Sequence, residues 1–149
     1  MSAMHKLSLA VQYATNAKNL PTRPQFRRWI KAALQRDVQI ALRIVDEAEG
    51  RELNKNFRSK DYATNVLTFV YDDDKPLSGD VVICAPIVEK EARKQHKDLR
   101  AHYAHLTIHA ALHLQGYEHD NDVDAAAMEA RETAILLKLG YADPYQVVT

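Results

Sequence analysis

The stretch LRAHYAHLTIHAALHLQGYEHD, residues 99–120, predicts a long helix that is followed at once by a turn. We expect the helix to run from about Leu99 to Gln115. It should stop at Gly116, because glycine readily takes the left-handed backbone conformation that ends many helices. This helix–turn unit carries five of the seven histidines of the chain, so the first question is whether they bind a metal.

Three of these histidines, His109, His113 and His119, form the pattern H-x-x-x-H-x-x-G-x-x-H. His109 and His113 share one face of a helix because they are four residues apart, and the turn brings His119 toward them. Three neutral imidazoles leave a fourth tetrahedral position open, as in catalytic zinc sites. Nickel and copper would also bind such a set, but it suits zinc best, so we expect one Zn²⁺ per chain. The alternative is three unrelated histidines without a ligand role, which this spacing disfavours.

The other histidines near this pattern are His96, His102 and His105. His105 is four residues before His109, but a site built on that pair would leave His113 unused. We therefore expect His105 to support the site or the fold without binding the metal. His96 and His102 are expected to face solvent or substrate.

The residue after the first histidine of the pattern is Ala110, where zinc peptidases have a glutamate that serves as general base. Peptide hydrolysis is therefore disfavoured. Phosphodiester cleavage is less demanding, because zinc lowers the pKa of bound water to near 7 and cations can stabilise the leaving alkoxide. Glu118 and Asp120 flank His119 and are the candidates for a general base. A solvated turn or a helix cap is an equally good interpretation of these two acids.

The rest of the chain alternates between strand-like and helix-like apolar patterns. The expected strands are 7–11, 38–44, 65–70 and 80–84, with a turn or loop over 72–79. The expected helices are 24–35 with Thr22 as its cap, 49–57, 86–97, 99–115, and a last helix from Asp122 or Asp124 to Gly140. This order predicts one α/β (α+β) domain over residues 1–149, with a small mixed sheet of about four strands covered by about five helices.

Two of the expected helices have residues whose spacing indicates the core. These residues are Leu53 and Phe57 in 49–57, and Ala126, Met128, Ile135 and Leu136 in the last helix.

The composition is typical of a globular protein, with 46% hydrophobic and 27% charged residues. The single Cys84 cannot form an internal disulfide, which fits a reducing compartment. The stretch LSLAV near the N-terminus is too short for a secretory signal, and no run approaches the ~20 apolar residues of a membrane span. We therefore expect a cytoplasmic protein without a membrane partner.

The net charge is zero, but the charges are unevenly distributed along the chain. Residues 1–60 contain 12 Lys and Arg against 5 Asp and Glu, whereas residues 61–149 contain 8 against 15. Charges commonly only solvate a surface. Alternatively, a basic surface from the first part would lie beside a site from the second, which would suit a polyanionic substrate.

With these residues together, the chain resembles the bacterial rRNA maturation factor family, the YbeY-type single-strand-specific endoribonucleases. The matching blocks are LNKNFRSKDYATNVLTF (53–69), GDVVIC (79–84), EARKQHK (91–97), HLTIHAALHLQGYEHD (105–120) and MEARETAILLKLGYADPY (128–145). The chain departs from the usual family residues at Thr68, Val70, Ala110 and Glu118, and none of these departures removes a histidine of the pattern.

The resemblance implies a zinc-dependent endoribonuclease that acts in rRNA maturation, ribosome assembly and 70S ribosome quality control. It implies a zinc site on His109, His113 and His119, and it places a functional arginine at Arg58, whose guanidinium can grip a phosphate. We take Arg58 and the ligand His113 as the catalytic residues. The residues do not decide whether water or the RNA 2′-hydroxyl attacks.

The partners that the resemblance implies are single-stranded RNA, rRNA precursors and ribosomal particles, with ribosomal proteins or a GTPase as further candidates. The rival hypothesis is a ribosome-assembly binding factor with a structural metal. A metal-dependent peptidase is a third and weaker hypothesis.

Overall fold

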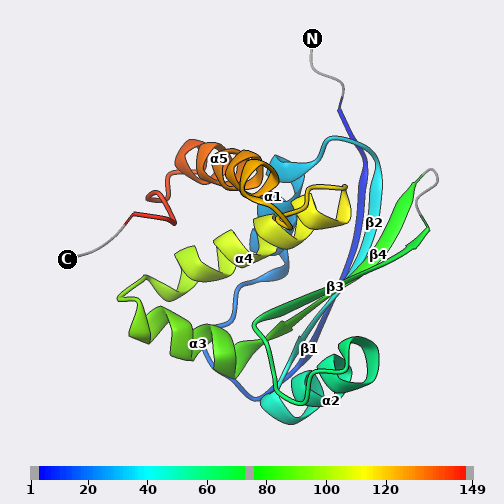
Figure 1. Cartoon of the computed structure of the whole chain (residues 1–149), viewed down its shortest axis with the longest axis vertical. Helices are drawn as coiled ribbons and strands as arrows, with labels where there is room; N and C mark the ends of the chain where they lie inside the picture. The colour runs from blue at the N-terminus through cyan, green and yellow to red at the C-terminus, as the bar shows by residue number, and fades with distance from the viewer. Residues whose placement is uncertain (1–3, 73–75, 147–149) are drawn as a thin grey trace.

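The structure, a computed structural model, describes residues 4–72 and 76–146, which form a four-stranded sheet and five helices (Figure 1). The strands are β1 (Leu7–Ala14), β2 (Val38–Val45), β3 (Val66–Asp72) and β4 (Leu77–Cys84). The helices are α1 (Arg23–Ala33), α2 (Glu47–Arg58), α3 (Ala85–Lys94), α4 (Leu99–Leu114) and α5 (Asp122–Lys138). The order of elements and the α+β class are those predicted from the sequence.

The sheet is mixed, with the strand order β1-β2-β4-β3. β1, β2 and β4 are parallel, and β3 pairs antiparallel to β4 at one edge. The predicted loop over 72–79 is too long, because β3 continues to Asp72 and β4 already begins at Leu77. Antiparallel pairing, including Val70 with Gly79, accounts for the extra strand residues. Residues 73–75 of the predicted loop lie outside the described residues.

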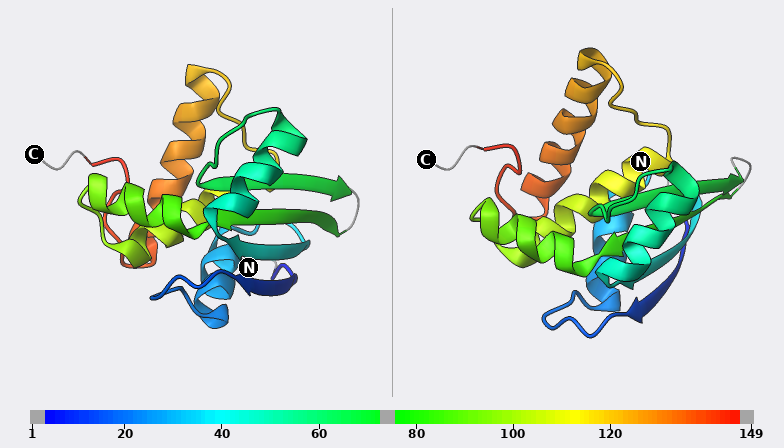
Figure 2. Two further views of the ribbon diagram at one scale, coloured as in Figure 1. Left: turned by 90° about the horizontal axis from the view of Figure 1, so that it is seen from below. Right: turned by 60° about the horizontal axis from the view of Figure 1, so that its bottom comes forward.

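The helices form layers on the two faces of the sheet (Figure 2). α1 and α4 pack on one face, α5 packs against α4, and α2 covers part of the other face. β4 accordingly buries side chains in both directions, since Val81 and Ile83 belong to the core under α1 and α4, whereas Val82 and Cys84 pack with Leu53 of α2. The alternation of a β-strand thus supplies both cores.

Helix caps explain where three of the helices begin. The side chain of Thr22 accepts a hydrogen bond from the Gln25 backbone at the start of α1, as predicted. Asp98 caps α4 and Asn121 caps α5 in the same way. The last helix therefore starts at Asp122, the first of the two predicted positions.

Two of the core residues predicted from helical spacing are wrong. Phe57 is 66% exposed and stacks edge-on against Phe69, and Ala126 is exposed near the start of α5. α2 covers only part of its face of the sheet, so one turn of apolar spacing does not guarantee burial there. Leu53 is packed against the smaller core, and Met128, Ile135 and Leu136 are buried as expected.

Close contact between β4 and the end of α4 fixes the position of the helix that carries the histidines. A Cβ atom on Gly79 would lie 2.7 Å from the Phe69 carbonyl oxygen and 2.9 Å from a methyl carbon of Leu114. Glycine is therefore needed at this position because the β3 backbone lies so close, and its small size also leaves room for Leu114 at the end of α4. No helix in the described part of the chain is long and apolar enough to cross a membrane.

Candidate metal centre

α4 is almost entirely buried, and its histidines interrupt that burial along one stripe. Within the helix after its first turn, only His105, His109 and His113 are partly exposed, while the residues between them are buried. The three are spaced by four residues, so they stand above one another on the side of the helix away from the sheet. The histidines that recur every four residues in the sequence therefore form a polar stripe on an otherwise buried helix.

The two ligand candidates on α4 are held through the same ring nitrogen. His109 Nδ1 donates a hydrogen bond to Glu132 Oε2 at 2.8 Å, and His113 Nδ1 donates to the Tyr117 carbonyl oxygen at 3.0 Å. Both partners can only accept, so the Nδ1 atoms carry the protons and the Nε2 atoms of neutral rings keep their lone pairs. Metal-binding histidines show this arrangement, in which the second ring nitrogen is anchored by an acceptor.

Burial keeps His113 in its neutral form. It lowers the pKa of His113, and the hydrogen bond to the Tyr117 carbonyl only partly opposes that effect. His109 and His119 lower the pKa further, because a proton on one ring disfavours a proton on its neighbours. A neutral ring is the form that binds a metal, so no proton has to be displaced near pH 7.

The segment between α4 and α5 brings His119 back to the two histidines of the helix, as predicted. Gly116 has φ of +108°, and it lets the chain reverse directly after α4. The ring centroids of His109 and His113 are 6.5 Å apart, and that of His119 lies 5.5 Å and 5.8 Å from them. The three rings therefore form a triangle.

This triangle is slightly wider than a closed zinc site. With Zn–N bonds of ~2.1 Å and tetrahedral angles, ring centres would lie ~5 Å apart. As the side chains stand, no group of three or more His, Cys, Asp or Glu residues among those described could hold a metal ion. The donor types and the anchored Nδ1 atoms fit zinc, and the pair that has to come closer to close the set is His109 and His113, whose ring centroids lie 6.5 Å apart.

A buried carboxylate, Glu132 of α5, lies behind the histidines. Its Oε1 accepts hydrogen bonds from His105 Nε2 at 2.6 Å and from the Tyr145 hydroxyl at 2.5 Å, in addition to the bond between Oε2 and His109. Burial raises the pKa of Glu132, but the three hydrogen bonds outweigh burial and bring the pKa to about 2. Glu132 is therefore ionised near neutral pH.

Sequence reasoning missed Glu132, although a signal was present. The buried residues of α5 are Met128, Glu132, Ile135 and Leu136, which recur at helical spacing. A carboxylate on the apolar stripe of a helix must find donors inside the protein, so its partners are worth seeking. His105, expected to support the site, is bonded to Glu132 rather than turned toward His113 and His119.

The prediction that His102 faces solvent or substrate is wrong. His102 is 4% exposed, and its Nε2 lies 3.0 Å from Glu91 Oε1. It projects from α4 toward α3, and its ring lies edge-on to that of His105, with the ring centroids 6.4 Å apart. His96, by contrast, is exposed in the turn after α3, where its φ is +55°.

The remaining predicted site residues are exposed. Glu118 and Asp120 flank His119, and a hydrogen bond with Asp120, together with its negative charge, raises the pKa of Glu118. Arg58 is the last residue of α2, and Ser59 after it takes the left-handed conformation that ends the helix. In the described part of the chain, Arg58 shows no hydrogen bond or ring contact with the three histidines.

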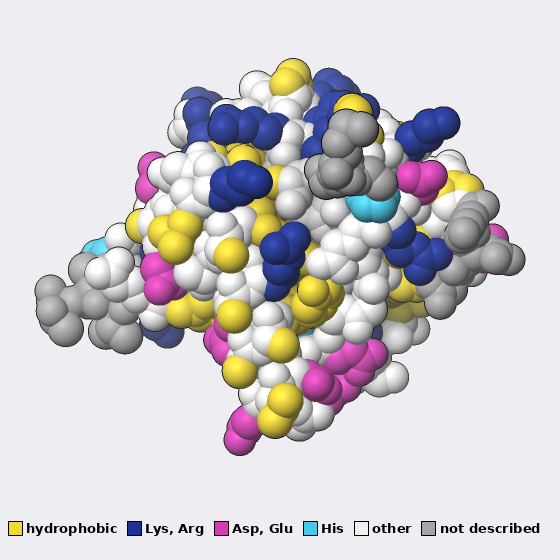
Figure 3. All heavy atoms as spheres, turned by 90° about the horizontal axis from the view of Figure 1, so that it is seen from above, with side chains coloured by type: hydrophobic (Ala, Val, Ile, Leu, Met, Phe, Trp, Pro, Cys, Tyr) yellow, Lys and Arg dark blue, Asp and Glu magenta, His cyan; other side chains and the backbone are white. Residues whose placement is uncertain are grey.

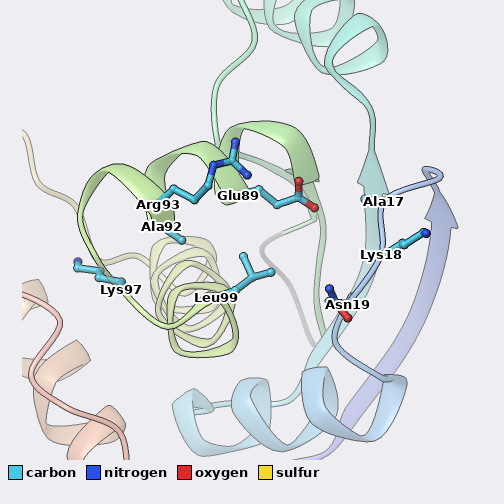
Figure 4. Close-up of a pocket in the computed structure, with 8 residues that line it drawn as sticks. All are labelled: Ala17, Lys18, Asn19, Glu89, Ala92, Arg93, Lys97 and Leu99. Carbon is cyan, nitrogen blue, oxygen red and sulfur yellow. The ribbon is translucent and has the colours of Figure 1, made fainter.

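The histidines open into one of several surface hollows. A hollow of about 310 Å³ is lined by His109, His119, Ala125, Met128, Glu129, Glu132 and Tyr145. A hollow of about 370 Å³ between the segment before α1 and α3 is lined by Lys18, Arg93 and Lys97 among others (Figure 4). Figure 4 shows Lys18 and Lys97 pointing in opposite directions, so these cations do not converge on one ligand.

Basic side chains gather on one side of the molecule. Figure 3 shows Lys and Arg side chains over one half of the face, and Asp and Glu mainly over the other half. α1, which packs against α4, contributes exposed Arg27, Arg28 and Lys31. The helix with the histidines thus has a neighbour with a cationic outer surface, an arrangement that would attract a polyanion.

Residues 11–140 match the protein-family model described as Endoribonuclease YbeY. The chain is 58% identical over 155 residues to the Endoribonuclease YbeY of Nitrosospira multiformis, covering 94% of this chain and 82% of that protein. It is 57% identical over 142 residues to the Endoribonuclease YbeY of Nitrosomonas europaea, covering 95% and 87%. A solution structure of a Thermotoga maritima protein, 24% identical, has the same fold, with a TM-score of 0.57 over 93% of this chain and 99% of that one.

Proposed function

Because the chain belongs to the Endoribonuclease YbeY family, we propose that it cleaves single-stranded RNA in rRNA maturation, using a zinc ion held by His109, His113 and His119. The observation that carries the zinc assignment is the anchoring of two Nδ1 atoms on α4, which leaves the Nε2 atoms as donors. When bound, zinc supplies a Lewis acid that polarises a phosphoryl oxygen and acidifies water. His113 is a catalytic residue in this proposal, as one of the three ligands.

Arg58 is proposed to bind the scissile phosphate and to neutralise the charge that develops on it. A guanidinium presents parallel N–H donors that match two phosphate oxygens, and it stays protonated throughout the reaction. The side chain is exposed at the end of α2, so an RNA strand can reach it. In this proposal the bound RNA strand contacts both Arg58 and the histidine site.

Proton transfer is proposed to fall to Glu118 and Asp120. They flank His119 in sequence, both are exposed, and carboxylates serve as general acids and bases. A peptidase mechanism would need a general base beside the first histidine, and Ala110 at that position has no group that can accept a proton. The acids of the turn therefore serve the phosphodiester reaction in this proposal.

The cellular setting is proposed from the family. The substrates would be rRNA precursors within ribosomal particles, in ribosome assembly and 70S ribosome quality control. Ribosomal proteins or a GTPase would assist, and the location would be the cytoplasm. The basic outer surface of α1 supports an RNA substrate, because phosphate contacts dominate the affinity of such complexes.

The direct test is metal analysis combined with RNA cleavage by the purified chain. We expect about one zinc per chain and cleavage of a single-stranded RNA, with much slower cleavage of the same sequence in a duplex. Removal of zinc with a chelator should abolish cleavage, and added zinc should restore it. Equal cleavage with and without metal would contradict the zinc mechanism, and no cleavage by the fully loaded protein would contradict the nuclease assignment.

A further inference from the structure

Glu132 is a buried carboxylate that accepts hydrogen bonds from three side chains. The side chain is 0% exposed, and it accepts hydrogen bonds from two histidines and one tyrosine. No lysine or arginine among the described residues forms an ion pair with it. Within the part of the chain that the structure describes, the negative charge of Glu132 therefore has no lysine or arginine as its counter-charge.

A lone buried charge of this kind is costly unless something compensates for it. The hydrogen bonds provide part of the compensation. The negative charge beside Nδ1 of His109 also affects the other nitrogen of the ring, Nε2. A carboxylate at Nδ1 fixes the ring tautomer and makes the Nε2 lone pair more basic. That Nε2 is the atom expected to face His113 and His119.

We propose that Glu132 is the positioning residue of the metal site, which fixes the tautomer and orientation of His109 and favours a divalent cation at the three histidines. This inference rests on the proposed zinc site and deepens it. Glu132 acts through His109 rather than on the RNA, because its side chain is 0% exposed and is hydrogen-bonded to His105, His109 and Tyr145.

A purely structural role is the alternative, since Glu132 also ties α5 to α4 through His105. The two roles predict different results when the Glu132 carboxylate is replaced by the neutral amide of glutamine. A tie between helices needs a hydrogen-bond acceptor, which glutamine retains. Control of the His109 tautomer needs an acceptor-only group at Nδ1. The amide nitrogen of glutamine can donate to Nδ1 instead and drive the proton to Nε2, where it blocks metal binding.

The test compares Glu132→Gln with the matched control Glu129→Gln. Glu129 is exposed on the same helix and lines the same hollow, so both variants lose one negative charge at a similar place. Zinc affinity, measured by competition with a chromophoric chelator, should fall by ~10- to 100-fold in Glu132→Gln. Glu129→Gln should bind zinc with nearly the parental affinity, since its carboxylate contacts no ligand.

A second measurement needs no variant. In the metal-free parent protein, ¹⁵N NMR of the imidazoles should show His109 with its proton on Nδ1. A proton on Nε2 would overturn the proposal. This NMR measurement tests the proposal even if Glu132→Gln does not fold.

Failure of the positioning role is distinguishable from failure of the proposed function. If the parent binds zinc, His113→Ala loses it, and folded Glu132→Gln keeps the parental affinity, only the positioning role is overturned. If the parent binds zinc as predicted but cleaves no RNA, the nuclease assignment fails and the role of Glu132 stands. A parent chain without zinc affinity overturns both.

Discussion

The two faces of the sheet differ in how far they bury their polar and aromatic side chains. On the α4–α5 side, His102 and Glu132 are buried, and each has a hydrogen-bonded partner. On the α2 side, Phe57 and Tyr71 are 66% and 69% exposed beside a groove of about 760 Å³. Arg58 ends the helix that borders this groove.

The two sides differ in when the geometry of their side chains is set. On α4 and α5 it is set before a ligand binds, whereas at the end of α2 it is set when the substrate binds. His109 and His113 are held by hydrogen bonds before any ligand arrives, which suits an ion with fixed bond lengths. The exposed Arg58 keeps its rotamer freedom and settles only when a partner binds. We therefore expect changes on the α4–α5 side to act on metal content, and changes at the end of α2 to act on turnover.

The largest effect is expected from His113→Ala. Two remaining imidazoles are too few to hold zinc tightly, so the purified variant should contain almost no metal. Metal analysis of the dialysed protein measures this, with His96→Ala as the control, because His96 is an exposed histidine in the turn after α3. His105→Ala should also keep its metal. Full zinc occupancy in His113→Ala would remove His113 from the ligand set.

The second largest effect is expected on the rate of RNA cleavage when Arg58 is replaced. Arg58→Ala should keep normal zinc content but slow cleavage at saturating RNA by ~100-fold or more, the scale seen when one preorganised donor is lost. Arg58→Lys should recover part of the rate, because a point charge replaces a two-pronged donor. If zinc-loaded Arg58→Ala turned over at the parental rate, the cleavage step would not involve Arg58.

A smaller effect is expected on the basic outer face of α1. Arg27 already donates a hydrogen bond to the Leu7 carbonyl at 3.3 Å, whereas the neighbouring Arg28 is exposed without such a bond to β1. Replacing both by glutamate should weaken RNA binding and reduce the slope of log K against log salt by roughly 2, if each arginine contacts one phosphate. Zinc content should not change. An RNA affinity that did not depend on salt would contradict a basic binding surface.

The smallest effect concerns pH and the buried His102. Burial lowers the pKa of His102, although its hydrogen bond with Glu91 opposes the shift. The unfolded chain therefore takes up a proton as pH falls below about 6.5 while the folded protein does not. This lowers the free energy of unfolding by up to ~1.4 kcal/mol per pH unit in the window between the two pKa values.

Denaturant unfolding of the metal-free protein between pH 5 and 8 measures this dependence. His102→Gln should show a weaker decline toward acid pH than the parent, and His96→Gln should follow the parent. The comparison with the parent cancels the contribution of the other histidines. An unchanged decline in His102→Gln would mean that His102 is not held in its neutral form.

Helical periodicity predicted positions well where a helix is buried deeply, and less well at its margins. Met128, Ile135 and Leu136 are in the core as predicted, because their stripe faces α4. Phe57 fits the same periodicity, yet it remains exposed because α2 covers only part of its face of the sheet. Periodicity identifies which residues share a face but not how far a neighbouring element extends over it.

The sequence by itself determined the order of strands and helices and the spacing that places His109 and His113 on one face of α4. It also determined the return of the chain at Gly116, because these features depend on local periodicity and on one residue that tolerates a positive φ. Only the tertiary structure decided that His102 is buried against Glu91 and that Glu132 of α5 meets His109. Those pairs join residues 11 and 23 positions apart on different helices, and their contact depends on how the helices pack, which local sequence patterns do not encode.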